Sequence, residues 1–293
     1  PDHYVIFEHL ATNTEETELA NYGIMLWGNM NHNYNENTMG YSNDSDISRV
    51  SHKSRSWNTP SLVGYMESHD EERVSRSVIN KFGLEQGVQR LKLNAAFFLT
   101  IPGPKMIWQF GELGYDYSIN HCPDGTVNNN CRTSNKPIKW DYQQVQDRAA
   151  LYTVYSKLNQ LRQHPLYKNN FYSDRVVHSF NGPFKWLQLT TDTSNIIVLG
   201  NFDVAASQAT ITFPNAGTWD DYLSGRRGQY AERYGALAPW RGRWDVKFLQ
   251  DLNFKVGGDA VNTLQFSVDI LNLGNLLYSH WGVVQQPQAV QPI

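Results

Sequence analysis

The feature that most constrains this chain is residues 62–73, LVGYMESHDEER, where an apolar run ends at a His-Asp pair and a cluster of charges. Barrel and open-sheet α/β enzymes carry their chemistry at such places, where a short buried strand delivers polar side chains at its carboxyl end. A solvated loop rich in Glu and Asp has much the same composition. Taken alone, this stretch therefore leaves catalysis and a plain charged loop as equal alternatives, and the flanking segments favour the first.

Four apolar, strand-like segments occur in the first 165 residues. Two of them, 23–27 and 62–70, end at Trp27 and Asp70. The other two, 4–7 and 105–110, are followed closely by the acids Glu8 and Glu112. Helical patterns lie between and after them: a polar cap with an acidic first turn over 14–19, and apolar side chains at helical spacing over 87–100 and 145–163. The polar stretch 29–54 has room for a short helix. Strands that alternate with helices predict a parallel α/β sheet, and four such units make half of an eight-fold barrel.

From residue 175 the pattern changes to short strands without helices. Turn sequences rich in Asn, Gly, Pro and Ser separate the segments 175–180, 184–190, 196–202 and 209–213. This pattern is typical of an antiparallel β-sandwich. Farther on, apolar and polar residues alternate over 244–256 and 264–270 around a Gly-Gly-Asp turn, which predicts a long two-stranded hairpin. We therefore expect three domains, 1–172, 173–225 and 226–293.

Charge and cysteine content limit the partners and the compartment. A net charge of -3 with 18% charged residues offers no basic surface for nucleic acid and no polybasic tract for an anionic membrane. Cys122 and Cys131 lie nine positions apart in a polar, loop-like segment. They would form a disulfide in an oxidising compartment and stay free thiols in the cytosol, and we favour the disulfide. The chain opens at Pro1 without a leader, so we expect a processed form or a fragment.

Three of these segments resemble motifs of the alpha-amylase family of glycoside hydrolases. YVIFEH at 4–9 is similar to the fifth-strand motif, YMESHD at 65–70 to the seventh-strand motif, and IPGPKMIWQFGE at 101–112 to the approach to the eighth strand. The β-rich segment is similar to the C-terminal sandwich of the family, so the resemblance covers residues 1–225. It implies an α/β fold in which a partial (β/α)8 TIM barrel, strands 5 to 8, occupies 1–172 and an antiparallel β-sandwich and a C-terminal β-hairpin follow.

The resemblance also implies a function, a retaining hydrolase of α-linked glucans in the extracellular space or the cell envelope (periplasm or outer membrane). Glu8 would be the acid/base residue, and Asp70 with His69 would hydrogen-bond ring hydroxyls more tightly as the sugar flattens toward the transition state. Trp27 and Tyr34 are candidates for stacking against sugar, with a place in the core or at the rim as the alternative for each. We expect no cofactor and no metal site here; a full-length family member could bind calcium.

The chain departs from the family where the nucleophile belongs. In the family the nucleophile is an Asp on the fourth strand, whereas this chain begins at what would be the fifth. We expect the chain to be inactive by itself, also because parallel strands without their neighbours have open edges. The alternatives are a non-catalytic carbohydrate-binding protein and a cell-envelope protein of glycan uptake.

The final segment, 226–293, resembles the C-terminal strands of TonB-dependent outer-membrane receptors. The residues that carry this resemblance are 240–246, WRGRWDV, and 266–282, which begin FSVDILNLGNLL. It implies membrane association through the hairpin alone, and the alternative is a hairpin that covers a soluble sheet. One hairpin cannot close a barrel, so no pore or transport follows. We interpret the chain as pieces of two proteins, joined by fusion or by an error of sequence assembly.

Overall fold

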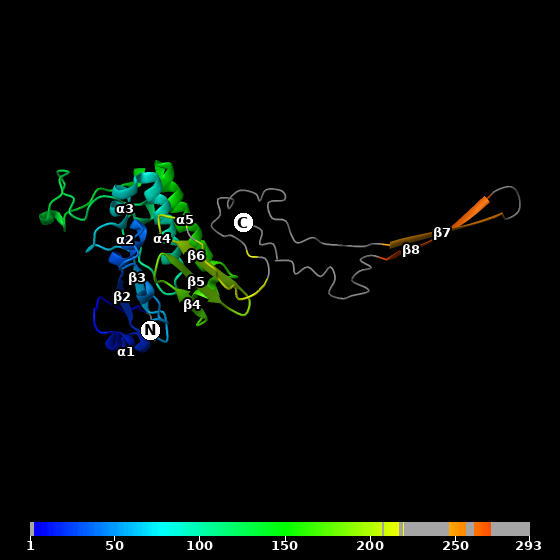
Figure 1. Ribbon diagram of the computed structural model, residues 1–293, viewed down its shortest axis with the longest axis horizontal. Coiled ribbons are helices and arrows are strands. Elements are labelled where there is room, and N and C mark those ends of the chain that lie inside the picture. The colour runs from blue at the N-terminus through cyan, green and yellow to red at the C-terminus, as the bar shows by residue number, and fades with distance from the viewer. Residues whose placement is uncertain (1–2, 207, 217–218, 220–245, 256–260, 271–293) are drawn as a thin grey trace. The chain divides into compact units, whose positions relative to one another are not determined.

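The computed structural model describes residues 3–206, 208–216, 219, 246–255 and 261–270. The chain divides into two compact units, residues 1–214 and 215–293 (Figure 1). The predicted boundaries at 172/173 and 225/226 stay a prediction.

A three-stranded parallel sheet organises the first part of the larger unit. Its strands β1 (Ile6–Phe7), β2 (Met25–Asn29) and β3 (Leu62–Tyr65) lie in that order. A fourth segment joins β3 only through a parallel bridge between Gly64 and Lys105. The predicted parallel sheet is therefore confirmed, but a partial barrel is not, because the fourth expected strand is reduced to this bridge. In addition, β2 extends two residues past Trp27, and β3 ends at Tyr65 rather than at Asp70.

Five α-helices connect and cover these strands in the described residues: α1 (Asn13–Tyr22), α2 (Asn31–Met39), α3 (Val74–Phe82), α4 (Leu84–Thr100) and α5 (Gln146–Gln163). Short 3-10 helices cover Ser48–Val50, Gly111–Leu113, Asn129–Cys131, Trp140–Gln144 and Lys168–Tyr172. Helix α1 begins where the side chain of Thr12 accepts the Glu15 N–H and ends at Gly23, which has a φ of 105°. The helices predicted over 14–19, 87–100 and 145–163 and in the 29–54 stretch are confirmed, whereas α3 was not predicted.

Helix α4 joins the parallel part of the unit to its antiparallel part. The Phe97 ring lies 6.2 Å from the ring of Phe180 and 5.2 Å from that of Phe202, both in the β-rich part. On the other side, Phe98 contacts Tyr34 of α2 edge-on, with ring centroids 6.3 Å apart. These aromatic side chains are all buried. Burial of such large apolar surfaces is the main stabilising contribution to a core of this kind.

The antiparallel part is one sheet, with the order β4-β5-β6. Its strands are β4 (Val176–Ser179), β5 (Phe184–Thr190) and β6 (Asn195–Asn201). Residues 208–213 have no regular secondary structure, so the strand expected over 209–213 is absent. Without it, the described residues of the antiparallel part form one three-stranded sheet, which packs on α4. The predicted β-sandwich, which needs two sheets, is therefore not confirmed.

The second unit contains the predicted hairpin. Strands β7 (Val246–Lys255) and β8 (Val261–Ile270) are antiparallel, with a register that pairs Val246 with Ile270 and Lys255 with Val261. Much of the stretch that carries the receptor resemblance, including 240–245 and 271–282, lies outside the described residues. Among the described helices, none combines the length and the apolar character that crossing a bilayer requires.

Candidate functional site

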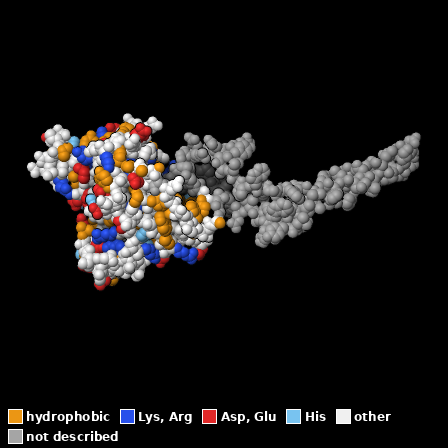
Figure 2. Space-filling model, viewed as in Figure 1, with side chains coloured by type: hydrophobic (Ala, Val, Ile, Leu, Met, Phe, Trp, Pro, Cys, Tyr) orange, Lys and Arg blue, Asp and Glu red, His pale blue; other side chains and the backbone are white. Residues whose placement is uncertain are grey.

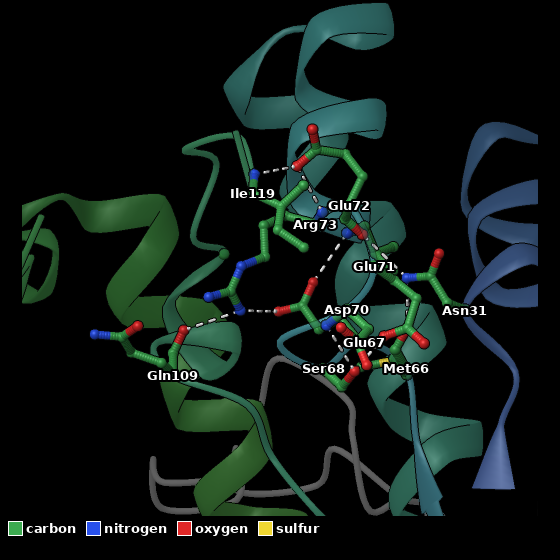
Figure 3. A network of polar contacts seen from close by, with 12 residues as sticks. Asn31, Met66, Glu67, Ser68, Asp70, Glu71, Glu72, Arg73, Gln109 and Ile119 are labelled. Carbon is green, nitrogen blue, oxygen red and sulfur yellow. Dashed lines mark hydrogen bonds and ion pairs between the residues drawn. The ribbon is translucent and has the colours of Figure 1, made fainter. Parts of the chain in front are cut away.

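The segment that follows β3, residues 66–73, is held against the end of β2 by hydrogen bonds (Figure 3). Asn29 donates to a carboxylate oxygen of Glu71, and Asn31 donates from Nδ2 to the carbonyls of Met66 (2.9 Å) and Glu72 (3.0 Å). Parallel neighbours end at the same edge of a sheet, which is where open α/β folds bind ligands. The segment thus lies at the edge where the sequence analysis expects a site.

Two side chains of this segment point inward and form a buried ion pair that the sequence analysis missed. Glu67 and Arg73 are only 5% and 3% exposed, and Arg73 Nη1 lies 3.3 Å from Glu67 Oε1. The Val74 N–H donates to the other Glu67 oxygen (2.9 Å), and Arg73 also donates to the Gln109 carbonyl (Figure 3). Burial raises the pKa of Glu67, while the positive charge of Arg73 opposes that shift. This pair fixes the turn and has no access to a ligand.

Two other side chains of this segment, His69 and Asp70, point outward. His69 and Asp70 are 55% and 52% exposed, and His69 Nε2 lies 3.2 Å from Asp70 Oδ2. The Asp70 N–H donates to Ser68 Oγ (3.1 Å), which fixes the backbone there. The Trp108 ring centroid is 5.9 Å from that of His69. A carboxylate, an imidazole and a flat indole ring are thus gathered in one accessible place, a combination suited to a ligand with many hydroxyl groups and apolar ring faces.

Glu8 lies directly after β1, at the same edge of the sheet, and is exposed to solvent. Its charge acts on Tyr65, at the end of β3. Burial raises the pKa of the Tyr65 hydroxyl, and the negative charges of Glu71, Glu8 and Asp70 raise it further. The half-buried Trp27 ring packs on Tyr65 with centroids 4.8 Å apart. Glu8 and Asp70 therefore both follow strands of this sheet, β1 and β3, at the same edge.

Tyr34 occupies a different environment from the other predicted site residues. Its side chain is 1% exposed in α2, and Asn94 of α4 donates to its backbone carbonyl (3.0 Å). A ring without an exposed face cannot stack on a sugar, so the alternative of a core residue fits this position. Trp27 lies at the rim and keeps part of its ring accessible.

A disulfide links Cys122 to Cys131, as we predicted, and closes a loop beside the site. Glu72 binds the segment that leads into this loop, because its carboxylate accepts from Ser118 Oγ (2.7 Å) and from the Ile119 N–H (2.9 Å) (Figure 3). No group of three or more His, Cys, Asp or Glu side chains in the described residues is arranged to hold a metal ion. The expectation about calcium stays a prediction.

An open groove of about 780 Å³ begins at Trp108. Burial raises the pKa of Glu112, which lies in this groove and belongs to the 3-10 helix Gly111–Leu113 rather than to a strand end. Other lining residues include Ile107, Trp140, Tyr152, Tyr155 and Gln160. On the outer surface, acidic and basic side chains are interspersed over the face in view, without a single patch of one sign (Figure 2).

No protein family model and no curated protein sequence matches this chain. Solved structures of the alpha-amylase family are similar to it at low identity. An alpha-amylase from H. orenii has 11% identity and a TM-score of 0.47, over 92% of this chain and 53% of that chain. An Anoxybacillus alpha-amylase has 14% identity and a TM-score of 0.45, over 92% of this chain and 50% of that chain. A maltotriose complex of a PulA mutant from Klebsiella pneumoniae has 13% identity and a TM-score of 0.47, over 68% of this chain and 34% of that chain.

The chain thus spans about half the length of the two amylases. TM-scores below 0.5 at such identities establish neither the fold nor the function of this chain. The resemblance to TonB-dependent receptors is not supported by these structures and stays a prediction.

Proposed function

We propose that this chain supplies the acid/base and sugar-positioning residues of a retaining, alpha-amylase-type glycoside hydrolase that acts on α-linked glucans. One observation carries the proposal: Glu8 and Asp70 follow two strands of one parallel sheet, β1 and β3, and so lie beyond the same edge of that sheet. Glycoside hydrolysis requires carboxyl groups that converge on a single sugar. Two acids at opposite ends of the sheet would have left the proposal without a physical basis.

Each exposed group has a distinct role in this proposal. Glu8 protonates the glycosidic oxygen and later activates water. The Asp70 carboxylate accepts hydrogen bonds from ring hydroxyls, and these bonds strengthen as the ring flattens, so they stabilise the transition state more than the bound substrate. His69, beside Asp70, contributes a second polar contact. Trp27 offers its accessible part as an apolar surface at the rim.

A second candidate function is carbohydrate binding without hydrolysis. Glu8 favours it, because this residue is exposed to solvent and is not enclosed in the kind of apolar pocket that helps a carboxyl act as an acid. In addition, no described residue is assigned as the nucleophile. We therefore infer that these residues bind α-glucan on their own and that turnover needs a nucleophile from elsewhere.

Binding and turnover can be measured separately. Calorimetric titration with maltoheptaose should give saturable binding, and Asp70→Asn should weaken it roughly tenfold or more, because hydrogen bonds to a charged acceptor are strong. Asp192→Asn is the matched control, since Asp192 is an exposed acid paired with Arg175 in the antiparallel part. Release of reducing sugar from soluble starch that is lost in Glu8→Gln would support hydrolysis. Binding without release would leave the second candidate, and absence of binding to any α-glucan would reject both.

We further infer that the chain works in an oxidising environment, extracellular or in the cell envelope. The Cys122–Cys131 disulfide supports this, since such bonds are rare in reducing compartments. Membrane association, if it occurs, would involve the hairpin alone. Thiol titration of the chain purified from its native host tests the location: two free thiols would contradict it.

A further inference from the structure

We propose that Arg132, held in place by the Cys122–Cys131 loop, positions Asp70 for the hydroxyl groups of an α-glucan. This inference rests on the proposed function and adds a residue and a loop to its site. Arg132 follows the second cysteine directly. It donates from Nη2 to the backbone carbonyl of Asp70, and the same nitrogen lies 3.8 Å from Asp70 Oδ1.

Asp70 is therefore held from two sides. His69 Nε2 lies beside Oδ2 at 3.2 Å, and the Arg132 guanidinium lies beside Oδ1 and the backbone carbonyl. The side chains of Arg132 and Asp70 remain 47% and 52% exposed. A guanidinium has five N–H donors, so Arg132 can contact Asp70 and still donate to a ligand. The resulting surface presents an acceptor and a donor side by side, as a vicinal pair of sugar hydroxyls requires.

The loop that carries Arg132 has an internal framework of its own. Cys122 and Cys131 are covalently joined, and the Asn128 N–H donates to the Asn120 carbonyl (2.9 Å). Lys136 donates to the carbonyls of His121 (3.1 Å) and Cys131 (2.6 Å). The segment that contains this loop is drawn in green and projects beside α3 (Figure 1). These bonds tie together the two ends of the loop, next to Arg132.

The loop is also attached to the site at a second point. Glu72 accepts hydrogen bonds from Ser118 and Ile119, just before the loop, and Arg132, just after it, donates to Asp70. Residues 70 and 72 thus bind the chain on both sides of the disulfide loop. We expect that opening the disulfide loosens the chain at Arg132 and leaves the Glu72 attachment intact. The role that we assign to the loop is therefore to orient the Arg132 guanidinium, and it is separate from any general contribution to folding.

The test combines a substitution with reduction of the intact protein. Arg132→Ala should weaken maltoheptaose binding about fivefold, the upper range for an exposed ion pair, and Arg132→Lys should recover part of the loss because it keeps the charge. Tris(2-carboxyethyl)phosphine reduces the disulfide to two thiols and becomes the phosphine oxide, taking its oxygen from water. This treatment should weaken binding by the wild-type chain to the same extent and have no further effect on Arg132→Ala. Arg175→Ala, which removes another exposed ion pair, should change neither the affinity for maltoheptaose nor the loss of affinity on reduction.

A second readout separates this proposal from the proposed function. At fixed pH, the imidazole NMR signals of His69 should shift in Arg132→Ala and in the reduced wild type, and should not shift in Arg175→Ala. If the wild type binds glucan and neither substitution nor reduction changes its affinity, the role of Arg132 is refuted. Independent, additive losses would show that the loop does not act through Arg132. If the wild type binds no glucan, the proposed function fails, and unshifted His69 signals would then also refute the hold of Arg132 on Asp70.

Discussion

Two pairs of charged side chains lie within one short segment and have opposite environments. Glu67 and Arg73 face inward and are buried, whereas His69 and Asp70 face outward and are about half exposed. The inward pair has hydrogen bonds to Val74 and Gln109, whereas Asp70 of the outward pair contacts Arg132 and His69 lies near the Trp108 ring. The first pair shapes the turn, and the second is available to a ligand.

This difference shows that the charge cluster after β3 has two functions that composition does not distinguish. A buried charge requires a partner, because leaving water is costly, and Glu67 has Arg73. An exposed pair contributes little to stability, so its position is explained better by binding. Three perturbations test this division, in order of the expected change in the free energy of unfolding.

Arg73→Ala should have the largest effect. It removes the partner of a buried carboxylate, for which a loss of about 3–5 kcal/mol in the free energy of unfolding is typical. Urea unfolding followed by circular dichroism measures the change. Arg175→Ala, the exposed counterpart, should lose less than about 1 kcal/mol. Equal losses in the two variants would show that the inward pair does not hold the turn.

The pH dependence of stability should also separate the pairs. Burial raises the pKa of Glu67 above its ordinary value of 4.5, so the folded chain keeps this proton to higher pH than the unfolded chain. The contribution of Glu67 is thus fully present below pH 4.5 and is lost as pH rises through the folded pKa, with a slope of at most about 1.4 kcal/mol per pH unit. Glu67→Gln should remove this part of the slope in urea unfolding from pH 4.5 upward, and the exposed Glu85→Gln should not. An unchanged slope in Glu67→Gln would contradict the burial effect.

Asp70→Asn should have the smallest effect on folding. The side chain is exposed and its amide isostere keeps the shape, so the free energy of unfolding should change by less than about 0.5 kcal/mol. Thermal unfolding beside the maltoheptaose titration measures both properties in one variant. A loss of stability as large as that of Arg73→Ala would show that the outward pair is structural too.

Much of the local structure could be predicted from the sequence. The apolar runs at 4–7, 23–27 and 62–65 gave parallel strands, because apolar β-prone segments separated by helices have few other packing solutions. The segment after Lys105 did not form a full strand, since a strand depends on backbone partners and the run itself does not specify them. The stretch 209–213 shows the same limit, because its apolar residues form no ladder in the structure.

The candidate site was predicted in part, for a similar reason. Glu8, His69 and Asp70 could be found from their places after strands, but the partner of Glu67 could not, because Arg73 is buried through contacts with distant residues such as Gln109 and Tyr115. Helix α3 did have a signal, since Val74, Val78 and Phe82 recur at intervals of four. The role of Arg132 depends on the folded path of the disulfide loop, which no local pattern encodes.

Strand β1 has a consequence for how the chain can be handled. It lies at the end of the order β1-β2-β3, and Val5, Ile6 and Phe7 are exposed there. An apolar strand at the edge of a sheet is a template for strand addition. Concentrating the purified chain should therefore favour intermolecular β-pairing at this strand, and a charged substitution such as Ile6→Lys should raise its solubility limit.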